Sequence, residues 1–429
     1  MQDEIIIKDP AELLEKIEEL HPSDIADSLK KIKKNNDDEF YAVLKQLPDD
    51  ILGDVLLELP DAIREETYSI LSIEQLTDAV EELESDDATD IFQEIEEVDV
   101  EKAKEIFEGL EVEDQQDINW LKRYEEEEAG AFMQTELFSA SLGETIGDSI
   151  ARLKAAKAED ELENIHQVFV TNEEKVLIAS ILLEDLIIFD FDKTYKEIIN
   201  SREDHFRPFK VQDNEEIDDV AKKFEKYDLS VVAVVGYGDM LIGRITSDDI
   251  LDVIEQNATE QIYQLAGVDE EYEHEEDFIT TSKKRALWLS LNLLTAILAS
   301  VVIGLFESTI QQYVALAILM PIVASMGGNA GTQTLAVMVR QMALGEIDLD
   351  NSRDAVKKEI FISIFNGLTF AFIMGIIASF WFKEPMLGVV IGMSMIINLF
   401  SAGFFGATIP LLLKKFDIDP AVGGTVLLT

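Results

Sequence analysis

The sequence predicts a multi-domain membrane protein with an all-α N-terminal region, two α/β units, a long connecting helix and an α-helical transmembrane region. Three observations predict this fold class. The acidic residues are concentrated before residue 283, because the rest of the 429-residue chain holds only 9 of its 87 Asp/Glu, together with 10 of its 35 Lys/Arg. Amphipathic and alternating apolar patterns fill the acidic part. Apolar stretches of bilayer-spanning length fill the remainder.

The first hundred residues contain four segments with the pattern apolar-x-Asp-x-apolar-x-x-apolar. This spacing is typical of short amphipathic helices, and the turn signals HPSD, LPDD and LPD lie between them. We therefore predict an acidic helical-repeat domain over residues 1–134, built of stacked helical hairpins. For Asp27 and Asp78 a capping or solvent-facing role is preferred. The four segments are IADSLKKI (25–32), LGDVLLEL (52–59), LTDAVEEL (76–83) and ATDIFQEI (88–95).

Two α/β units follow, over residues 135–199 and 200–255. In each unit an apolar strand, a turn carrying Asn or Gly, a second strand and an Asp-led helix occur in that order. Tandem units of this size resemble a CBS pair. The second unit carries the Gly-x-x-Thr-x-x-Asp ending of that family as Gly243, Thr246 and Asp249.

The CBS resemblance makes Thr246 and Asp249 candidate nucleotide contacts, and ATP a candidate ligand of the pair. The first unit departs from the pattern. The loss of the small glycine and of the hydroxyl group weakens the case for a nucleotide ribose there. Its residues at the equivalent positions are Ala179, Leu182 and Asp185.

An acidic segment predicted as a connecting helix and linker, residues 248–282, leads into the transmembrane region, residues 283–429. Lysines and arginines flank the region and occupy its loop between the second and third spans, so the positive-inside rule places the acidic part in the cytoplasm. The last residues, DIDPAVGGTVLLT, read as the start of a fifth span, which predicts that the natural chain continues. The four full spans are 286–306, 313–339, 360–382 and 385–413.

Composition limits the functions that are open to this chain. A net charge of −52 repels nucleic acid and concentrates cations, so it argues against DNA or RNA binding and favours metal binding. A single acid run is most often only a solvated face. The absence of cysteine excludes disulfides and thiolate chemistry, and the four histidines are too scattered for a histidine metal site. The N-terminus lacks the pattern of a signal peptide.

The segment PIVASMGGNAGTQ, residues 321–333, places polar groups inside the second apolar span. Polar groups in hydrocarbon must face protein or a water-filled path. Gly327 and Gly331 form a Gly-x-x-x-Gly pair that fits close helix packing. Asn329 and the carbonyls freed by Pro321 fit neutral oxygen donors to a hydrated divalent cation. Both interpretations stay open for the glycines. A P-loop is excluded because no Lys-Ser/Thr follows.

Together these features resemble the MgtE family of magnesium transporters over essentially the whole chain. The residues that carry the resemblance are HPSDIADSL, LPDDILGDVLLELP, the tandem α/β units and PIVASMGGNAGTQ. The resemblance implies a homodimeric magnesium channel, not an enzyme, in the inner membrane with five membrane helices per subunit. It also implies that intracellular Mg²⁺ binds between acidic surfaces and closes the pore through the connecting "plug" helix. Apposed carboxylates repel each other unless a divalent cation lies between them.

The resemblance also assigns residues. It implies that the pore is lined by Gly328, Asn329, Ala330, Gly331 and Thr332. It implies a magnesium sensor formed by Glu58, Asp86, Asp90, Asp228, Asp249, Asp252 and Glu260. Asn257 and Gln261 stand where relatives often have acids, and Glu255, Asp269 and Glu270 could substitute. The aspartate that holds the pore ion in relatives would lie beyond Thr429.

Two other functions stay open from the residues. The first is an anion channel with regulatory CBS domains, although the acidic cytoplasmic region would repel anions at the inner mouth. The second is a nucleotide-sensing CBS module that is anchored to the membrane and transports nothing. Ion uptake by cells and nucleotide binding distinguish these alternatives from a magnesium channel.

Overall fold

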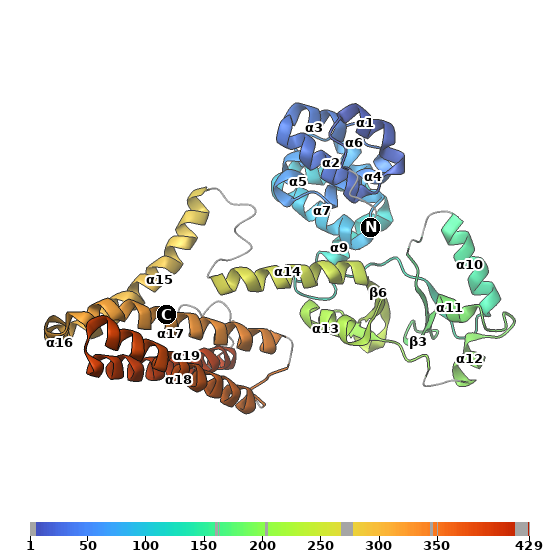
Figure 1. Cartoon of the computed structure of the whole chain (residues 1–429). Helices are drawn as coiled ribbons and strands as arrows, with labels where there is room; N and C mark the ends of the chain where they lie inside the picture. The colour runs from blue at the N-terminus through green and yellow to red at the C-terminus, as the bar shows by residue number, and fades with distance from the viewer. Residues whose placement is uncertain are drawn as a thin grey trace. The chain divides into compact units, whose positions relative to one another are not determined.

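The computed structural model describes residues 6–158, 162, 164–201, 205–266, 278–343, 346–349, 351–416 and 428 (Figure 1). The chain divides into two compact units, Met1–Gln256 and Asn257–Thr429, and each is described by itself. The first unit contains a helical region and two small β-sheets. The second unit contains long apolar helices.

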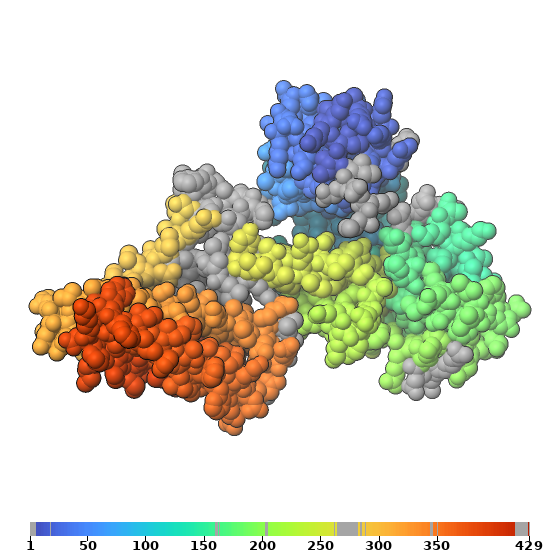
Figure 2. Space-filling view, in the orientation of Figure 1, coloured from blue at the N-terminus to red at the C-terminus, as the bar shows by residue number. Residues whose placement is uncertain are grey.

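The helical region of the first unit forms one body around a continuous apolar core (blue in Figure 2). The apolar positions of the repeated pattern supply this core, and Leu29, Leu52 and Leu76 are fully buried. Asp27 pairs with Lys30 at 2.7 Å on the surface, as preferred from the sequence. The helices are α1 (Pro10–Lys16), η1 (Ile17–Glu19), α2 (Pro22–Asn35), α3 (Asp37–Leu44), α4 (Asp49–Leu57), α5 (Asp61–Tyr68), α6 (Ile73–Glu81), α7 (Ser85–Val98), α8 (Val100–Gly109) and α9 (Val112–Leu121).

The two α/β units have the same topology, which confirms the predicted tandem pair. In each, the first strand pairs parallel with the second, and the second pairs antiparallel with the third. The first α/β unit contains β1 (Ser139–Ser141), α10 (Ile146–Ala158), β2 (Gln167–Thr171), β3 (Leu177–Leu182), α11 (Leu183–Leu186) and α12 (Tyr195–Ser201). The second α/β unit contains β4 (Lys210–Gln212), α13 (Ile217–Tyr227), β5 (Val231–Val235), η2 (Tyr237–Asp239) and β6 (Leu241–Thr246).

An apolar cluster joins the two sheets. Phe169 and Leu177 of the first sheet pack with Ala233 and Val235 of the second, and all four side chains are buried. The backbone amide of Leu241 also donates to the carbonyl of Lys175 at 3.0 Å. The pair therefore forms one body through side-chain and backbone contacts.

The segment between α9 and β1 runs along β6. Gln134 and Arg244 exchange backbone hydrogen bonds of 2.8 and 2.9 Å. Gly243 makes this approach possible, because a Cβ there would lie 2.8 Å from the Met133 sulfur and 2.9 Å from the Gln134 carbonyl oxygen. The glycine of the Gly-x-x-Thr-x-x-Asp pattern therefore has a packing role in this chain.

Replacing Gly243 by alanine is expected to destabilise the first unit by about 1–3 kcal/mol, because the new methyl group meets a backbone oxygen. Thermal unfolding of the full chain, followed by protease resistance of the first unit, measures this effect. Gly143→Ala is the matched control, because no atom lies within 4 Å of a Cβ at Gly143. Equal midpoints for the two variants would contradict the packing role.

Helix α14 (Ser247–Ala266) follows β6 directly and crosses the boundary between the two units. It corresponds to the helical part of the predicted connecting segment. The linker at 267–277 and the predicted start of a fifth span at 417–427 lie outside the described residues. Because α14 is continuous, its first turns belong to the first unit and its last turns to the second.

The second unit contains four helices that are long and apolar enough to cross a membrane, among the residues described. Their apolar segments are Arg285–Gly304, Val314–Ala343, Arg353–Phe382 and Pro385–Lys415, which confirms the four predicted spans. Helix α17 continues through Pro321. The helices are α15 (Phe278–Gly304), α16 (Glu307–Gln312), α17 (Val314–Ala343), α18 (Arg353–Phe382) and α19 (Pro385–Lys415).

Candidate cation sites

Acidic residues from two helix N-termini lie together in the first unit. Helix α7 is preceded by Glu84 and has Asp86 and Asp87 in its first turn, and α14 has Asp249 in its first turn. Carboxylates are favoured at these positions by the partial positive charge of a helix N-terminus. We call Glu84, Asp86, Asp87, Asp90, Asp249 and Asp252 the acidic cluster.

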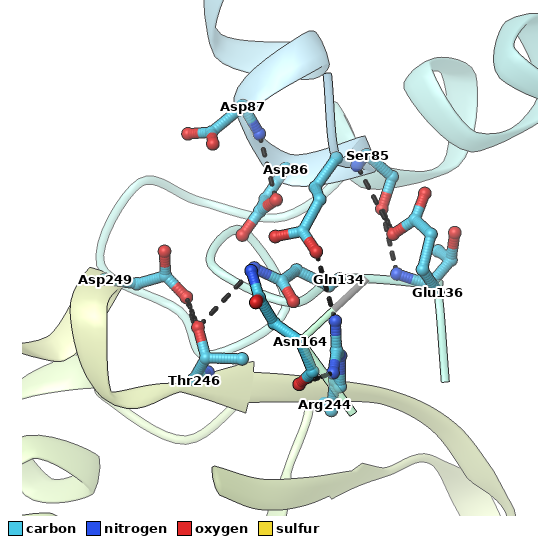
Figure 3. Close-up of polar contacts among 11 residues, drawn as sticks. Ser85, Asp86, Asp87, Gln134, Glu136, Asn164, Arg244, Thr246 and Asp249 are labelled. Carbon is cyan, nitrogen blue, oxygen red and sulfur yellow. Dashed lines mark hydrogen bonds and ion pairs between the residues drawn. The ribbon is translucent and has the colours of Figure 1, made fainter. Parts of the chain in front are cut away.

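Hydrogen bonds fix the two sides of the acidic cluster (Figure 3). The Ser85 hydroxyl donates to Glu136 Oε2 at 2.9 Å and accepts from the Thr135 amide at 2.8 Å. These bonds hold the start of α7 against the segment that lines β6. On the other side, the Thr246 hydroxyl donates to Asp249 Oδ2 at 2.7 Å. Both groups of carboxylates are therefore held in place.

Burial and mutual repulsion raise the pKa values of the acidic cluster. Asp86 is only 5% exposed, and its pKa lies well above the ordinary range because of burial and then the charge of Asp249. The same two causes raise the pKa of Asp87 to about 8. Burial raises the pKa of Asp249 to about 6 and that of Asp90 to about 7. Asp90 keeps an exposed side chain, so water screens its charge more than that of Asp86. Bringing these charges together is unfavourable unless a cation compensates them.

The raised pKa values predict that the first unit loses stability as pH rises in the absence of magnesium. A carboxyl group whose pKa is raised by folding carries no penalty below its unfolded pKa of about 4, and the full penalty develops above the folded pKa. The pH range over which stability is lost therefore extends up to the pKa values of Asp87 and Glu84, about 8 and about 7. We expect a lower unfolding midpoint near pH 8 than near pH 5 in chelator, and millimolar Mg²⁺ should reduce the difference. A midpoint that rises with pH in chelator would contradict this.

The structure brings most of the predicted sensor residues together. Burial is the largest cause of the raised pKa values of Asp86, Asp90 and Asp252. The charge of Asp249 adds to the shift of the first two, and the charge of Glu58 adds to that of Asp252. Glu58, at the end of α4, accepts a hydrogen bond from the Ser23 hydroxyl at 2.6 Å. These five residues thus act on one another across three helices.

Two predicted sensor residues lie elsewhere. Asp228 is an exposed residue in the left-handed conformation that ends α13 (φ 50°, ψ 50°), which is a capping position. Glu260 lies beyond the boundary at residue 256 and belongs to the second unit. The sequence interpretation missed Glu84 and Asp87, although both stand beside Asp86 in the run ESDDATD. Acids at a helix start look like ordinary capping residues until their burial is known.

The donor chemistry of the acidic cluster fits a hydrated divalent cation. Within the described part of the chain, no three Asp, Glu, His or Cys side chains are arranged to hold a metal ion directly. Magnesium retains several waters and needs few direct protein ligands, so a charged interface suits it better than a closed cage. Asp86, Asp87 and Asp249 are the carboxylates that would face such an ion.

The candidate nucleotide contacts are occupied by contacts within the chain. Thr246 donates to Asp249, and its hydroxyl oxygen lies 3.5 Å from Gln134 Nε2, from which it accepts a hydrogen bond. Thr246 itself is buried. A nucleotide that used these two side chains would have to compete with the bond between them.

In the second unit, helical periodicity divides the polar segment of α17 into two faces. Gly327, Gly331 and Thr334 are buried, whereas Asn329 and Thr332 are exposed. The buried face meets α19, because a Cβ at Gly406 would lie 2.8 Å from the Gly331 carbonyl oxygen. The glycine pair is therefore a packing element. Of the five predicted pore residues, Gly331 is buried, Ala330 is partly buried, and the exposed ones are Gly328, Asn329 and Thr332.

Asn398 of α19 belongs to the packing face. Its side-chain amide donates to the Val323 carbonyl oxygen at 2.6 Å and covers Gly327. Gly403 of α19 packs against Ser363 of α18. The small residues of α19 therefore serve contacts with its neighbours in this chain.

Gly327→Ala is expected to weaken the contact between α17 and α19, because the new Cβ would clash with the Asn398 amide group. The measurement is the thermal stability of the detergent-solubilised full chain. Gly328→Ala is the control one residue away, where no atom lies within 4 Å of a Cβ. Equal losses in both variants would show that the contact does not depend on Gly327.

One buried carboxylate of the second unit was missed from the sequence. Glu359 of α18 is 8% exposed and accepts a hydrogen bond from the Thr334 hydroxyl of α17 at 3.2 Å. Thr334 lies on the buried face one turn after Ala330. The bond ties the polar segment of α17 to α18. An acid among basic loop residues gives little sequence signal for such a role.

Family models match most of the chain. A model described as "Divalent cation transporter" matches residues 320–429, and one described as "MgtE intracellular N domain" matches residues 20–127. A CBS domain model matches residues 201–256.

Two curated relatives and one solved structure are similar to this chain. The magnesium transporter MgtE of Enterococcus faecalis is 34% identical over 313 residues, which are 73% of this chain and 67% of that protein. The magnesium transporter MgtE of Thermus thermophilus is 32% identical over 308 residues, 71% of this chain and 67% of that protein. The crystal structure of the cytosolic domain of the Mg²⁺ channel MgtE in complex with ATP is 29% identical, with a TM-score of 0.51, and covers 57% of this chain and 95% of that one.

Proposed function

Because the chain belongs to the MgtE family of magnesium transporters, we propose that it is a magnesium-selective channel whose opening is controlled by intracellular Mg²⁺. It is a multi-pass protein of the bacterial inner membrane with a cytoplasmic N-terminal region. It transports magnesium and catalyses no reaction. The regulatory ions bind between the acidic surfaces of the helical region, the CBS pair and α14.

The observation that carries the proposed gating is the buried contact between the acidic ends of α7 and α14. Burial, and then the charge of Asp249, hold the pKa of Asp86 well above the ordinary range. A divalent ion placed there would replace repulsion by attraction. Loss of that ion at low intracellular magnesium would spread the surfaces, and α14 would carry this change toward the transmembrane helices.

The pore is proposed to lie along the axis of a homodimer, lined by the exposed face of α17. Asn329 and Thr332 offer an amide and a hydroxyl group on that face, and Gly328 leaves backbone accessible. These neutral oxygen donors suit an ion that keeps its water shell. In the proposed dimer, a partner copy faces this polar surface across the pore.

Growth rescue of a magnesium-starved host tests the proposal. Expression of the protein should restore growth at low external magnesium and produce Mg²⁺ influx that falls as internal magnesium rises. Chloride flux without magnesium flux would support the anion channel instead. Influx that does not change with internal magnesium would support magnesium transport but contradict the proposed sensor.

ATP binding at the CBS pair is the second candidate function, supported by the similar cytosolic domain solved with ATP. Thr246 and Asp249 are the residues of this chain at the family pattern, and they already bond to each other. Titration of the full chain with ATP, with Thr246→Val as the altered variant, tests the assignment. Equal affinity in both would place the nucleotide elsewhere.

A further inference from the structure

Arg244 is a buried cation at the edge of the acidic cluster. It lies near the end of β6, its residue is 2% exposed, and it is among the largest fully buried side chains of the described residues. Its backbone exchanges two hydrogen bonds with Gln134, so its position is fixed by the same packing that requires Gly243. An arginine at this depth remains charged and needs paired oxygen acceptors.

The guanidinium group of Arg244 joins two segments that are distant in sequence. Its Nη2 donates to Glu84 Oε1 at 3.1 Å, and its Nη1 donates to the carbonyl oxygen of Asn164 at 3.0 Å (Figure 3). Glu84 lies directly before α7, and Asn164 lies between α10 and β2. The helical region is thus connected to both halves of the CBS pair through one side chain.

The charge of Arg244 opposes the repulsion in the acidic cluster. Burial raises the pKa of Glu84, whereas Arg244 lowers it, and Glu136 and Asp249 raise it again. Among these partners Arg244 supplies the positive charge. Unlike a magnesium ion, it is covalently part of the chain and does not dissociate when free magnesium falls. It therefore acts on the contact between α7 and the CBS pair at every magnesium concentration.

We propose that Arg244 is a built-in counter-ion of the magnesium sensor. It keeps the N-terminus of α7 attached to the CBS pair in magnesium-free protein, and so it sets how far the sensor opens. This rests on the proposed function. Magnesium then closes the remainder of the interface, around Asp86, Asp87 and Asp249. The ion pair of Arg244 with Glu84 then limits how far the helical region and the CBS pair separate.

Hydrogen exchange of the full-length protein in chelator tests this. The Thr135 amide donates to the Ser85 hydroxyl, so its exchange rate reports on the attachment of α7. We expect Arg244→Gln and Glu84→Gln each to speed exchange of peptides containing Thr135 by about tenfold or more in chelator, with the double variant no faster than the singles. Millimolar Mg²⁺ should restore slow exchange in each, which shows that the fold is intact.

Arg152→Gln is the matched control, because Arg152 pairs with Glu144 on the surface with a side chain that is 51% exposed. It removes the same charge and should leave exchange at Thr135 unchanged. If Arg244→Gln and Glu84→Gln exchange at the wild-type rate in chelator, the inference is overturned. Fast exchange of these variants that persists in Mg²⁺ would overturn it too. Glu84→Gln decides the matter if Arg244→Gln fails to fold, since Glu84 is partly exposed. Proteolysis of the wild-type cytoplasmic region at a rate that Mg²⁺ does not change would instead reject the sensor itself.

Discussion

Magnesium protection of the cytoplasmic region against proteolysis is expected to disappear in a variant that carries asparagine in place of four aspartates of the acidic cluster: Asp86, Asp90, Asp249 and Asp252. In the proposed sensor these carboxylates oppose contact between the helical region and the CBS pair until a divalent cation joins them. Asparagine removes both the repulsion and the ion. We expect the same cleavage rate with and without Mg²⁺, or a shift of at least about tenfold in the concentration that protects.

A charge-matched control separates the acidic cluster from the general charge of the region. The control replaces four exposed acids outside the acidic cluster by their amides: Asp37, Glu39, Glu173 and Glu225. It changes the net charge equally and should keep the magnesium response. Equal protection by Mg²⁺ in the cluster variant and in the wild type would remove the acidic cluster from the sensor. If both variants lose the magnesium response, the protection depends on the total electrostatic field of the acidic region and not on the acidic cluster.

Magnesium influx is expected to stop when Asn329 is replaced by tryptophan. On the proposed pore face, the indole ring would fill the path of a hydrated ion and remove an amide oxygen donor. Assembly should be unaffected, because Asn329 is exposed on the face of α17 away from the buried glycines. Influx into magnesium-starved cells measures the change, and size-exclusion chromatography in detergent measures the assembly.

Asn366→Trp is the matched control for this variant. It makes the same replacement at an exposed position of α18 and should retain influx. If Asn329→Trp conducts as well as the control, then Asn329 belongs to a packing surface. If it fails to assemble, the exposed face of α17 is a contact between subunits.

Much of the fold is predictable because its signals are local. Hydropathy over bilayer-spanning lengths identifies the four membrane helices, and the repeated apolar spacing identifies the helices of the first domain. Alternation and turn residues identify the strands β2, β3, β5 and β6. Each of these signals lies within one short window of sequence.

The candidate sites are less predictable because they depend on contacts between distant residues. Glu84 and Arg244 are 160 residues apart, and neither resembles a motif. An arginine in the apolar strand LIGRIT could have been noticed, but its partner could not. Glu359 and Thr334 also meet only through helix packing. The split of PIVASMGGNAGTQ into two faces is implied by helical periodicity, yet the choice of the buried face requires the neighbouring helix.

The pairing of the segment around Gln134 with β6 has a consequence for biosynthesis. Gln134 and Thr246 are 112 residues apart, so the surface against which α7 docks is complete only after β6 has left the ribosome. The helical region, with its own core, can fold well before that moment. The membrane helices follow β6 in the chain, so every residue of the acidic cluster is synthesised before the first of them. In the proposed channel, a nascent chain would therefore carry the residues of its regulator before those of its pore.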